Sequence, residues 1–331
     1  MKLTDKFGRI HDYVRISLID KCYFNCIYCN PSNSPARYDT NKSILSYEEL
    51  YRLIRILVRN LEVKKIRFTG GEPLIRKNVI NFFEMIYPLK KQYGFEIGIT
   101  TNGARLSDKI ESLKNFGVDK LNISLDTLNR NKFIAITGKD YFVQTLSAIE
   151  KATGLNFKSV KVNVVVIKNI NDEELTDFVE YFKSHPVTLR FIEYMPFAGN
   201  QWDDSKFFSW NGMKTQIEKK YSLKEIDGDG KVSKDFLVEG ENLKLGFISS
   251  ISDHFCDGCN RLRITATGKI KNCLFANPSE LSLKSLLMDE SITDETIVEF
   301  IRNTLKSKWI KHPSAKELAE LNQNNMMSIG G

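Results

Sequence analysis

Short apolar runs alternate with amphipathic helical patterns over the first two thirds of the chain. Runs rich in β-branched residues predict six strands, at 13–19, 65–69, 96–101, 121–126, 160–167 and 187–195. Patterns with the helical period lie between them, beginning at Ser46 and continuing at 79–90, 108–116, 142–153 and 172–183. Strand-then-helix units in succession predict a parallel sheet. Six units rather than eight favour a partial (β/α)6 TIM-type barrel, and a doubly wound sheet is the alternative that periodicity leaves open.

The regular alternation ends near Asn200, and the pattern of the remaining chain is mixed. It predicts, in order, a turn, two hairpin strands and two helices, at 227–230, 262–266, 269–274, 281–287 and 295–306. We therefore expect two domains. The partial barrel occupies 1–200, and an α+β extension that carries a second metal site occupies 201–331.

Polar residues gather where the predicted strands end. They are Thr69 to Pro73, Thr100 to Gly103, Asn122 with Ser124 and Asp126, Lys161 with Asn163, and Arg190 with Glu193 to Met195. Polar groups that face a barrel interior cost free energy unless water or a ligand meets them, and barrel chemistry gathers at the carboxyl ends of strands. The sequence therefore predicts a ligand-filled interior, in which Glu72 is a candidate to bind an ammonium group.

Composition and charge narrow the class of protein. Of 331 residues, 42% are hydrophobic and 27% are charged, which is typical of a globular protein. The net charge of +7 suits an anionic ligand, but Lys and Arg are spread along the chain, so nucleic-acid binding is not expected. The first residues lack an apolar signal region and no apolar run reaches membrane-spanning length, so we expect a cytoplasmic protein without membrane association.

The loop after the first predicted strand contains Cys22, Cys26 and Cys29 in a C-x3-C-x2-C spacing. Iron–sulfur clusters normally take four cysteines. Three thiolates hold three irons of a four-iron cluster and leave the fourth iron open to a ligand, as in catalytic metal sites. A structural zinc loop is the alternative, but zinc spacing normally includes a second Cys or His pair further along, and none follows here.

A second triad, Cys256, Cys259 and Cys273, lies near the end of the chain. Arg261 and Arg263 directly follow its second cysteine, and alternate residues of a strand share one face. Two guanidinium groups side by side suit a polyphosphate. The triad again lacks a fourth protein ligand, and a structural zinc site completed by His254 is the alternative.

The motifs CYFNCIYC, TGGEPL, TTNG, NISLD, CDGCNRLRITATGKIKNCLF and the closing MMSIGG together resemble the GTP 3′,8-cyclase family of molybdenum-cofactor biosynthesis, within the radical S-adenosylmethionine (SAM) superfamily. The resemblance runs over nearly the whole chain. It implies a lyase with two [4Fe-4S] clusters and SAM as cofactors. The reaction implied is conversion of GTP to (8S)-3′,8-cyclo-7,8-dihydroguanosine 5′-triphosphate, with SAM cleaved to methionine and 5′-deoxyadenosine.

The resemblance also implies roles for individual residues. The six cysteines of the two triads match cluster ligands. Positions that contact SAM are matched by Tyr28, Gly71, Ser124 and Met195. Positions that contact GTP are matched by Arg15, Arg67, Thr100, Lys161, Arg261, Leu262 and Arg263, and Arg190 is a further candidate. Catalytic roles are implied for Arg15, Arg261, Arg263, Gly330 and Gly331, the glycines belonging to a tail that reaches the active site. The tail departs from the family in carrying Asn upstream of the glycines, where a basic residue is expected.

Two other functions remain open. A radical SAM enzyme with an auxiliary cluster could act on a peptide, although such enzymes tend to have more C-terminal cysteines. A non-enzymatic zinc or nucleic-acid-binding module would contain no iron. As partners of the cyclase, the resemblance implies GTP, an external electron donor and the downstream cyclic pyranopterin monophosphate synthase, and a homodimer is a plausible assembly.

Overall fold

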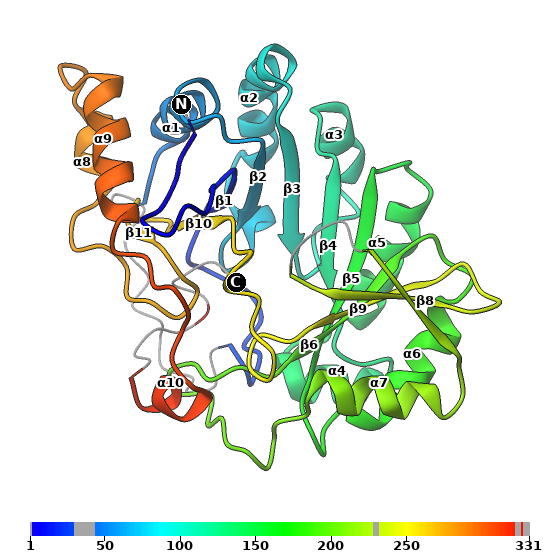
Figure 1. The fold of residues 1–331 in the computed structure, drawn as a ribbon. Coiled ribbons are helices and arrows are strands. Elements are labelled where there is room, and N and C mark those ends of the chain that lie inside the picture. The colour runs from blue at the N-terminus through cyan, green and yellow to red at the C-terminus, as the bar shows by residue number, and fades with distance from the viewer. Residues whose placement is uncertain (1, 30–43, 228–231, 322–325, 327–331) are drawn as a thin grey trace.

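The computed structural model describes residues 2–29, 44–227, 232–321 and 326, and within these ranges eleven strands form one sheet (Figure 1). Six strands are parallel and adjacent in chain order: β1 (Tyr13–Ser17), β2 (Lys65–Thr69), β3 (Glu96–Thr101), β4 (Lys120–Ser124), β5 (Ser159–Val166) and β6 (Thr188–Glu193). A doubly wound sheet would reverse its strand order at a switch point. The partial (β/α)6 barrel is therefore confirmed, and the doubly wound alternative is wrong.

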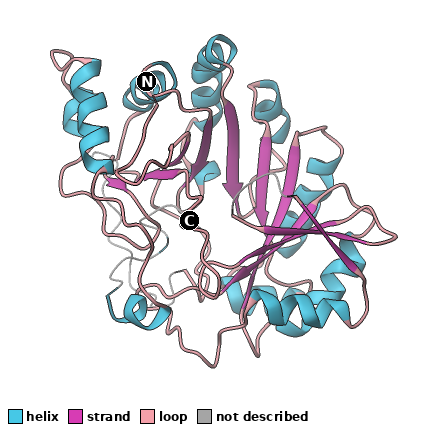
Figure 2. Ribbon diagram, in the orientation of Figure 1, coloured by secondary structure: helices cyan, strands magenta, loops and turns pink. Residues whose placement is uncertain are grey.

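Helices join the parallel strands and pack on the outer face of the sheet, as Figure 2 shows. They are α1 (Tyr47–Arg59), α2 (Val79–Tyr93), α3 (Ile110–Asn115), α4 (Arg130–Thr137), α5 (Phe142–Thr153) and α6 (Leu175–Phe182), with 3-10 turns η1 (Pro73–Ile75) and η2 (Asp172–Glu174). Phe68 of β2 packs edge-on against Phe82 and Phe83 of α2, with ring centroids 5.3 Å apart in both pairs. This buried aromatic layer holds α2 against the sheet.

Alternation along each strand separates the core from the interior of the barrel. On β1, the side chains of Val14 and Ile16 have no exposed surface and belong to the hydrophobic core. Their neighbours Tyr13 and Arg15 line a cavity on the opposite face. The polar positions that the sequence places on one side of the strands are therefore the positions that face inward.

The C-terminal third lengthens the sheet at both edges. At one edge β10 (Arg261–Ile264) is parallel to β1 and β11 (Ile270–Lys271) is antiparallel to β10, which confirms the predicted hairpin. At the other edge β9 (Lys244–Ile248) is parallel to β6, and β8 (Lys234–Val238) and β7 (Leu223–Ile226) follow antiparallel. The division into domains at residue 200 stays a prediction, and the sheet continues across it.

The remaining helices are α7 (Trp210–Glu218), α8 (Leu283–Met288), α9 (Asp294–Leu305) and α10 (Ala315–Leu321). Within the described ranges, no helix is both long enough and apolar enough to cross a membrane. The predicted turn over 227–230 lies almost wholly outside the described residues, which include only its first position.

Glu193, at the end of β6, ties the barrel to the C-terminal third. Its carboxylate has no exposed surface and accepts hydrogen bonds from the backbone N–H groups of Trp210 at 2.9 Å, Ile251 at 2.8 Å and Ser252 at 3.0 Å. One buried side chain therefore fixes both the start of α7 and the loop after β9.

We expect Glu193→Gln to destabilise the fold, because an amide replaces one acceptor oxygen and leaves buried N–H donors unpaired. The loss is roughly 2 kcal/mol in the free energy of unfolding, measurable as a lower urea midpoint by circular dichroism. Glu225→Gln, at an exposed position of β7, is the matched control and should not move the midpoint. An unchanged midpoint for Glu193→Gln would show that the carboxylate contributes nothing to the connection.

Candidate active site

A cavity of about 560 Å³ lies inside the open barrel, and all six cysteines line it. Its walls come from the inward faces of the parallel strands and of β10, and from the segments that follow β1, β9 and β11. The two triads are about 230 residues apart in sequence, so only the fold brings them to one cavity. The prediction that each triad belongs to a separate site is compatible with this placement, because the triads enter the cavity from different segments.

The first triad lies in the loop that follows β1, and α4 holds this loop in place. Asn25 donates its backbone N–H to the carbonyl of Thr137 at 2.8 Å, and Ile27 donates to Ile136 at 3.0 Å. Cys29 donates its backbone N–H to the carbonyl of Cys26 at 2.9 Å, which closes a tight turn. The end of a helix therefore fixes the backbone from which two of the three thiols project.

The charge environment of the first triad fits ligands of an iron–sulfur cluster. Burial, followed by the charge of Glu72, raises the pKa of Cys22 to about 12, and burial with neighbouring thiolates holds the pKa values of Cys26 and Cys29 well above their usual range. Three partly buried thiolates in one short loop are stable only with a compensating cation, which iron would supply. Donors are also in place, since Phe24 N–H points at Cys22 Sγ at 3.4 Å.

No three His, Cys, Asp or Glu side chains in the described ranges converge on one point as a single metal ion would require. A four-iron cluster instead takes each thiolate on a different iron. Three cysteines in one loop offer the thiolate donors that such a cluster takes.

The second triad is held by two cations from distant parts of the chain. Arg9 donates to the carbonyl of Cys256 at 2.8 Å, and the buried Lys308 donates to the carbonyl of Arg261 at 3.1 Å and to that of Asn272. Although burial opposes the shift, Lys308 and Arg261 lower the pKa of the Cys259 thiol. A thiol that ionises readily is a good metal ligand.

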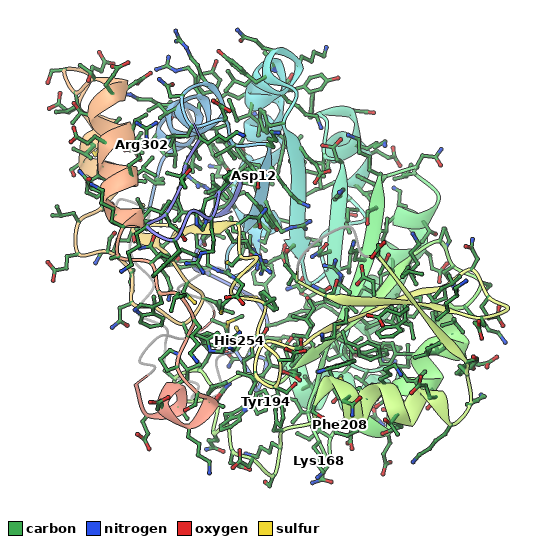
Figure 3. All side chains as sticks on the ribbon, viewed as in Figure 1. Asp12, Lys168, Tyr194, Phe208, His254 and Arg302 are labelled. Carbon is green, nitrogen blue, oxygen red and sulfur yellow. The ribbon has the colours of Figure 1, made fainter. Side chains whose placement is uncertain are left out.

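His254 lies on the loop between β9 and β10, where Figure 3 labels it, and lines the cavity beside the second triad. Its ring meets that of His312 edge-on, with centroids 5.6 Å apart. The zinc alternative assigned His254 as a fourth ligand, and that assignment stays a prediction.

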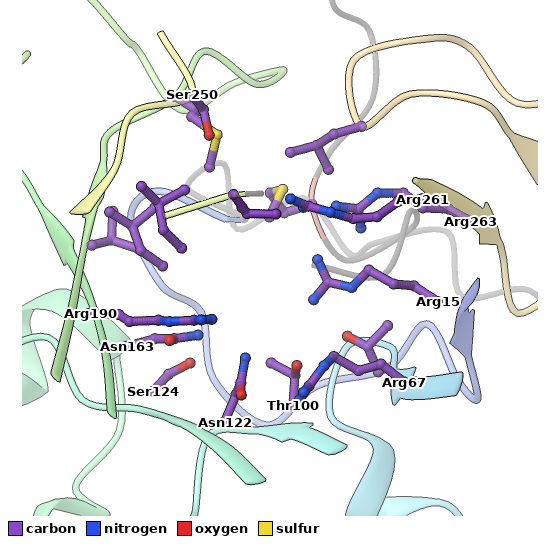
Figure 4. A pocket seen from close by; sticks show the side chains of 18 of the residues that line it. Arg15, Arg67, Thr100, Asn122, Ser124, Asn163, Arg190, Ser250, Arg261 and Arg263 are labelled. Carbon is purple, nitrogen blue, oxygen red and sulfur yellow. The ribbon is translucent and has the colours of Figure 1, made fainter. Parts of the chain in front are cut away.

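Two rows of cationic and aromatic side chains cross the sheet at the β10 edge. The registers of β10, β1 and β2 align Arg263 with Arg15 and Arg67, and the residues two positions earlier align as Arg261, Tyr13 and Lys65. Figure 4 shows the four arginines reaching into the cavity from one side. The sequence predicts each of these arginines as a GTP contact, and the fold brings all four together.

The arginines repel one another in the absence of an anion. Burial, followed by the charge of Arg263, lowers the pKa of Arg15 well below its usual range, and burial with Arg261 lowers the pKa of Arg263 to about 10. Arg67 is anchored, since it donates to the Tyr13 hydroxyl at 2.8 Å and to the Ile99 carbonyl at 2.9 Å. Such a cluster is built to receive a multiply charged anion.

The opposite wall carries neutral polar groups and two further cations. The registers of β3 to β6 align Thr100 with Asn122 and Lys161, and align Ser124 with Asn163 and Arg190. Four buried atoms here have no hydrogen-bond partner among the described residues: Thr100 Oγ1, Asn122 Oδ1, Asn163 Oδ1 and Arg190 Nε. Buried polar atoms normally have partners, so these atoms point to a bound ligand or water.

The predicted SAM contacts all line the cavity. They are Tyr28, Gly71, Ser124 and Met195. The Tyr28 hydroxyl donates to Asp126 at 2.7 Å. A side chain at Gly71 would place its Cβ 2.2 Å from the carbonyl oxygen of Lys21, so only glycine fits this close approach of two backbones.

Two predicted site residues need correction, and two lie outside the described part of the chain. Glu72 does not line the cavity. Its carboxylate accepts hydrogen bonds from Leu74 N–H, the Thr101 hydroxyl and Asn102 N–H. These hydrogen bonds occupy the oxygens that an ammonium group would need. The Leu262 side chain packs in the core, and Leu262 is not among the residues that line the cavity. Gly330 and Gly331 lie outside the described residues.

Two family models and several known proteins are similar to this chain. It matches the Radical SAM superfamily over residues 16–182 and Molybdenum Cofactor Synthesis C over residues 187–314. It is 40% identical to a GTP 3′,8-cyclase of Thermodesulfovibrio yellowstonii, covering 92% of this chain and 94% of that relative. It is 39% identical to a mitochondrial GTP 3′,8-cyclase of Arabidopsis thaliana, covering 99% and 83%.

Other relatives are longer. Molybdenum cofactor biosynthesis protein 1 of Dictyostelium discoideum is 43% identical over 99% of this chain, but the match covers 52% of that relative. The chain thus spans about half the length of the first relatives it matches. Among solved structures, Streptococcus suis SuiB bound to S-adenosylmethionine aligns with a TM-score of 0.63 at 16% identity, covering 90% of this chain and 69% of that chain, a likeness of fold.

Proposed function

The chain belongs to the GTP 3′,8-cyclase family of radical SAM proteins, and on that premise we propose that it converts GTP to (8S)-3′,8-cyclo-7,8-dihydroguanosine 5′-triphosphate, the first step of molybdenum cofactor biosynthesis. One observation carries the proposal: two cysteine triads and five arginines line a single cavity. A triphosphate has the charge to satisfy the arginines, and each triad has the donors for one cluster.

Different residues of the cavity have different roles in this reaction. The Cys22 triad would hold one cluster, which would supply the electron that cleaves SAM, and the Cys256 triad would hold a second, which would offer an open iron as a ligand site. The arginine rows bind the triphosphate through charge-assisted, bidentate hydrogen bonds. With the phosphates anchored, the ribose is held between the arginines and the SAM side, where Ser124 and Asn163 offer hydrogen-bonding groups. The barrel wall excludes water and stray hydrogen donors.

The decisive assay supplies SAM and dithionite to the anaerobically reconstituted chain, with and without GTP. We expect GTP to raise the rate of 5′-deoxyadenosine formation at least about tenfold, since substrate completes the site, whereas ATP should have little effect. A rate that GTP leaves unchanged would reject the cyclase and favour the peptide-modifying alternative. A colourless preparation that holds zinc and no iron would favour the zinc module.

We further propose the partners that this reaction requires. An external donor must supply electrons, and the product is the substrate of a downstream cyclic pyranopterin monophosphate synthase. A homodimer is the assembly we propose, testable by light scattering. Six cysteines assigned to metal binding suit a reducing compartment, which supports a cytoplasmic location.

A further inference from the structure

A line of three residues crosses the sheet where the C-terminal third joins the barrel. Arg190 of β6 is in register with Gly246 of β9, and Gly246 is in register with Asp235 of β8. Side chains at registered positions share one face of the sheet. Arg190 and Asp235 therefore lie on the same face, two strands apart, with a glycine between them.

Gly246 leaves a space that both neighbours enter. A Cβ atom at this position would lie 2.9 Å from Asp235 Oδ1 and 3.3 Å from Arg190 Cγ. Adjacent strands are about 4.8 Å apart, so the two side chains can approach each other only across a residue without a side chain. Since the backbone of Gly246 is not in the left-handed region, the close approach, rather than the backbone conformation, favours glycine here.

The negative charge of Asp235 also acts on Arg190. Arg190 lines the cavity and reaches into it from the wall opposite Arg15 and Arg261, as Figure 4 shows. Burial lowers the pKa of Arg190 to about 10, while the carboxylate of Asp235 favours its charged form and Arg67 and Arg261 oppose it. Asp235 is itself buried, with 8% of its surface exposed, and its Oδ1 has no hydrogen-bond partner among the described residues.

We propose that Asp235 is a positioning residue, which holds Arg190 in the cavity through the gap at Gly246 so that Arg190 binds the anionic part of the substrate. The identity of that substrate, GTP, rests on the proposed function. The C-terminal third thereby contributes to substrate binding from both edges of the sheet: Arg261 and Arg263 come from one edge, and the Asp235 carboxylate supports an arginine at the other.

Two single variants test the proposal in the full-length, reconstituted chain, with GTP and SAM affinities measured by anaerobic equilibrium dialysis. Asp235→Asn removes the charge at nearly constant volume, and Gly246→Ala fills the gap. Each should weaken GTP binding about tenfold, as expected for one charge-assisted contact, and raise the KM for GTP. SAM affinity and iron content should stay within twofold, which separates positioning from a general structural loss. Glu225→Gln on the neighbouring β7 is the control.

Two double variants identify the partner. In an Arg190→Met background, Asp235→Asn should cost less than twofold, because no guanidinium remains to be positioned. In an Asp235→Ala background, Gly246→Ala should cost less than in the unaltered chain, because the closest contact of the new Cβ, Asp235 Oδ1, is gone. Two results would overturn the positioning role. One is that Asp235→Asn leaves GTP binding unchanged. The other is that Asp235→Asn weakens GTP binding by the same factor in the unaltered chain and in the Arg190→Met background. If the unaltered chain failed to bind GTP, the proposed function would fail, and the ligand assigned to Arg190 with it.

Discussion

Cys26→Ala protein should form no 5′-deoxyadenosine above background, whereas Cys259→Ala protein should still cleave SAM but lose its response to GTP. The reason is the position of each triad. Cys26 lies in the loop beside the predicted SAM contacts, and Cys259 lies beside the arginines that we assign to GTP. Removing one thiolate from a three-cysteine site leaves two protein ligands, too few to retain a cluster that normally takes four.

Iron analysis and product chromatography check this prediction on the same samples. The iron content of each variant should fall from about eight to about four atoms per chain. Only Cys26→Ala should reduce the rate of SAM cleavage. The reduction should be about a thousandfold, as is usual when an essential group is removed. The two variants control for each other, because both remove one cysteine and one cluster. Retention of SAM cleavage by Cys26→Ala would show that the first triad is not the SAM site.

The barrel could be predicted because its local patterns are strong. Short β-branched runs such as 65–69 and 96–101 match β2 and β3 residue for residue. Alternation of Asn122 and Ser124 with buried apolar neighbours identified the face that lines the cavity. These patterns depend on residues close in sequence, so they can be recognised without a structure.

Other features escaped prediction because they depend on distant partners or weak local signals. α4 was not predicted, since its eight residues carry little amphipathic pattern, and only the Asn129 cap, which accepts from Lys132 N–H at 3.0 Å, indicates its start. The pairing of β10 with β1 joins segments almost 250 residues apart. Nothing in the local sequence marks Arg9 or Lys308 as anchors of the second triad, because each acts on a backbone carbonyl far along the chain.

Glu72 shows how a correct motif can mislead about a side chain. The Gly-Gly-Glu-Pro segment lies at the cavity, as predicted, through Gly70 and Gly71. The carboxylate turns away to join the ends of β2 and β3, where it accepts from Asn102 N–H at 2.7 Å. A motif locates a backbone more reliably than it assigns each of its side chains.

The charges of the four arginines should favour GTP binding but lower the stability of the ligand-free protein. A single substitution should separate these two effects. Arg15 stands between Arg263 and Arg67 in register and is partly buried, so its charge is repelled from both sides. A group whose pKa is lowered on folding binds protons less well in the folded state than in the unfolded one, and therefore costs stability while it is charged. If GTP is the substrate, as we propose, its triphosphate should reverse this balance when it binds.

Arg15→Met should therefore weaken GTP binding while it leaves the ligand-free protein at least as stable. Losing one member of a buried charge-assisted contact costs about 3 kcal/mol, or roughly a hundredfold in the dissociation constant for GTP. The thermal midpoint without GTP should stay constant or rise, and the increase that GTP causes in the unaltered protein should disappear. Arg130→Met removes an exposed arginine paired with Asp140 and is the control. If Arg15→Met lowered the midpoint and left GTP affinity unchanged, Arg15 would be a structural residue and the arginine rows would need another ligand.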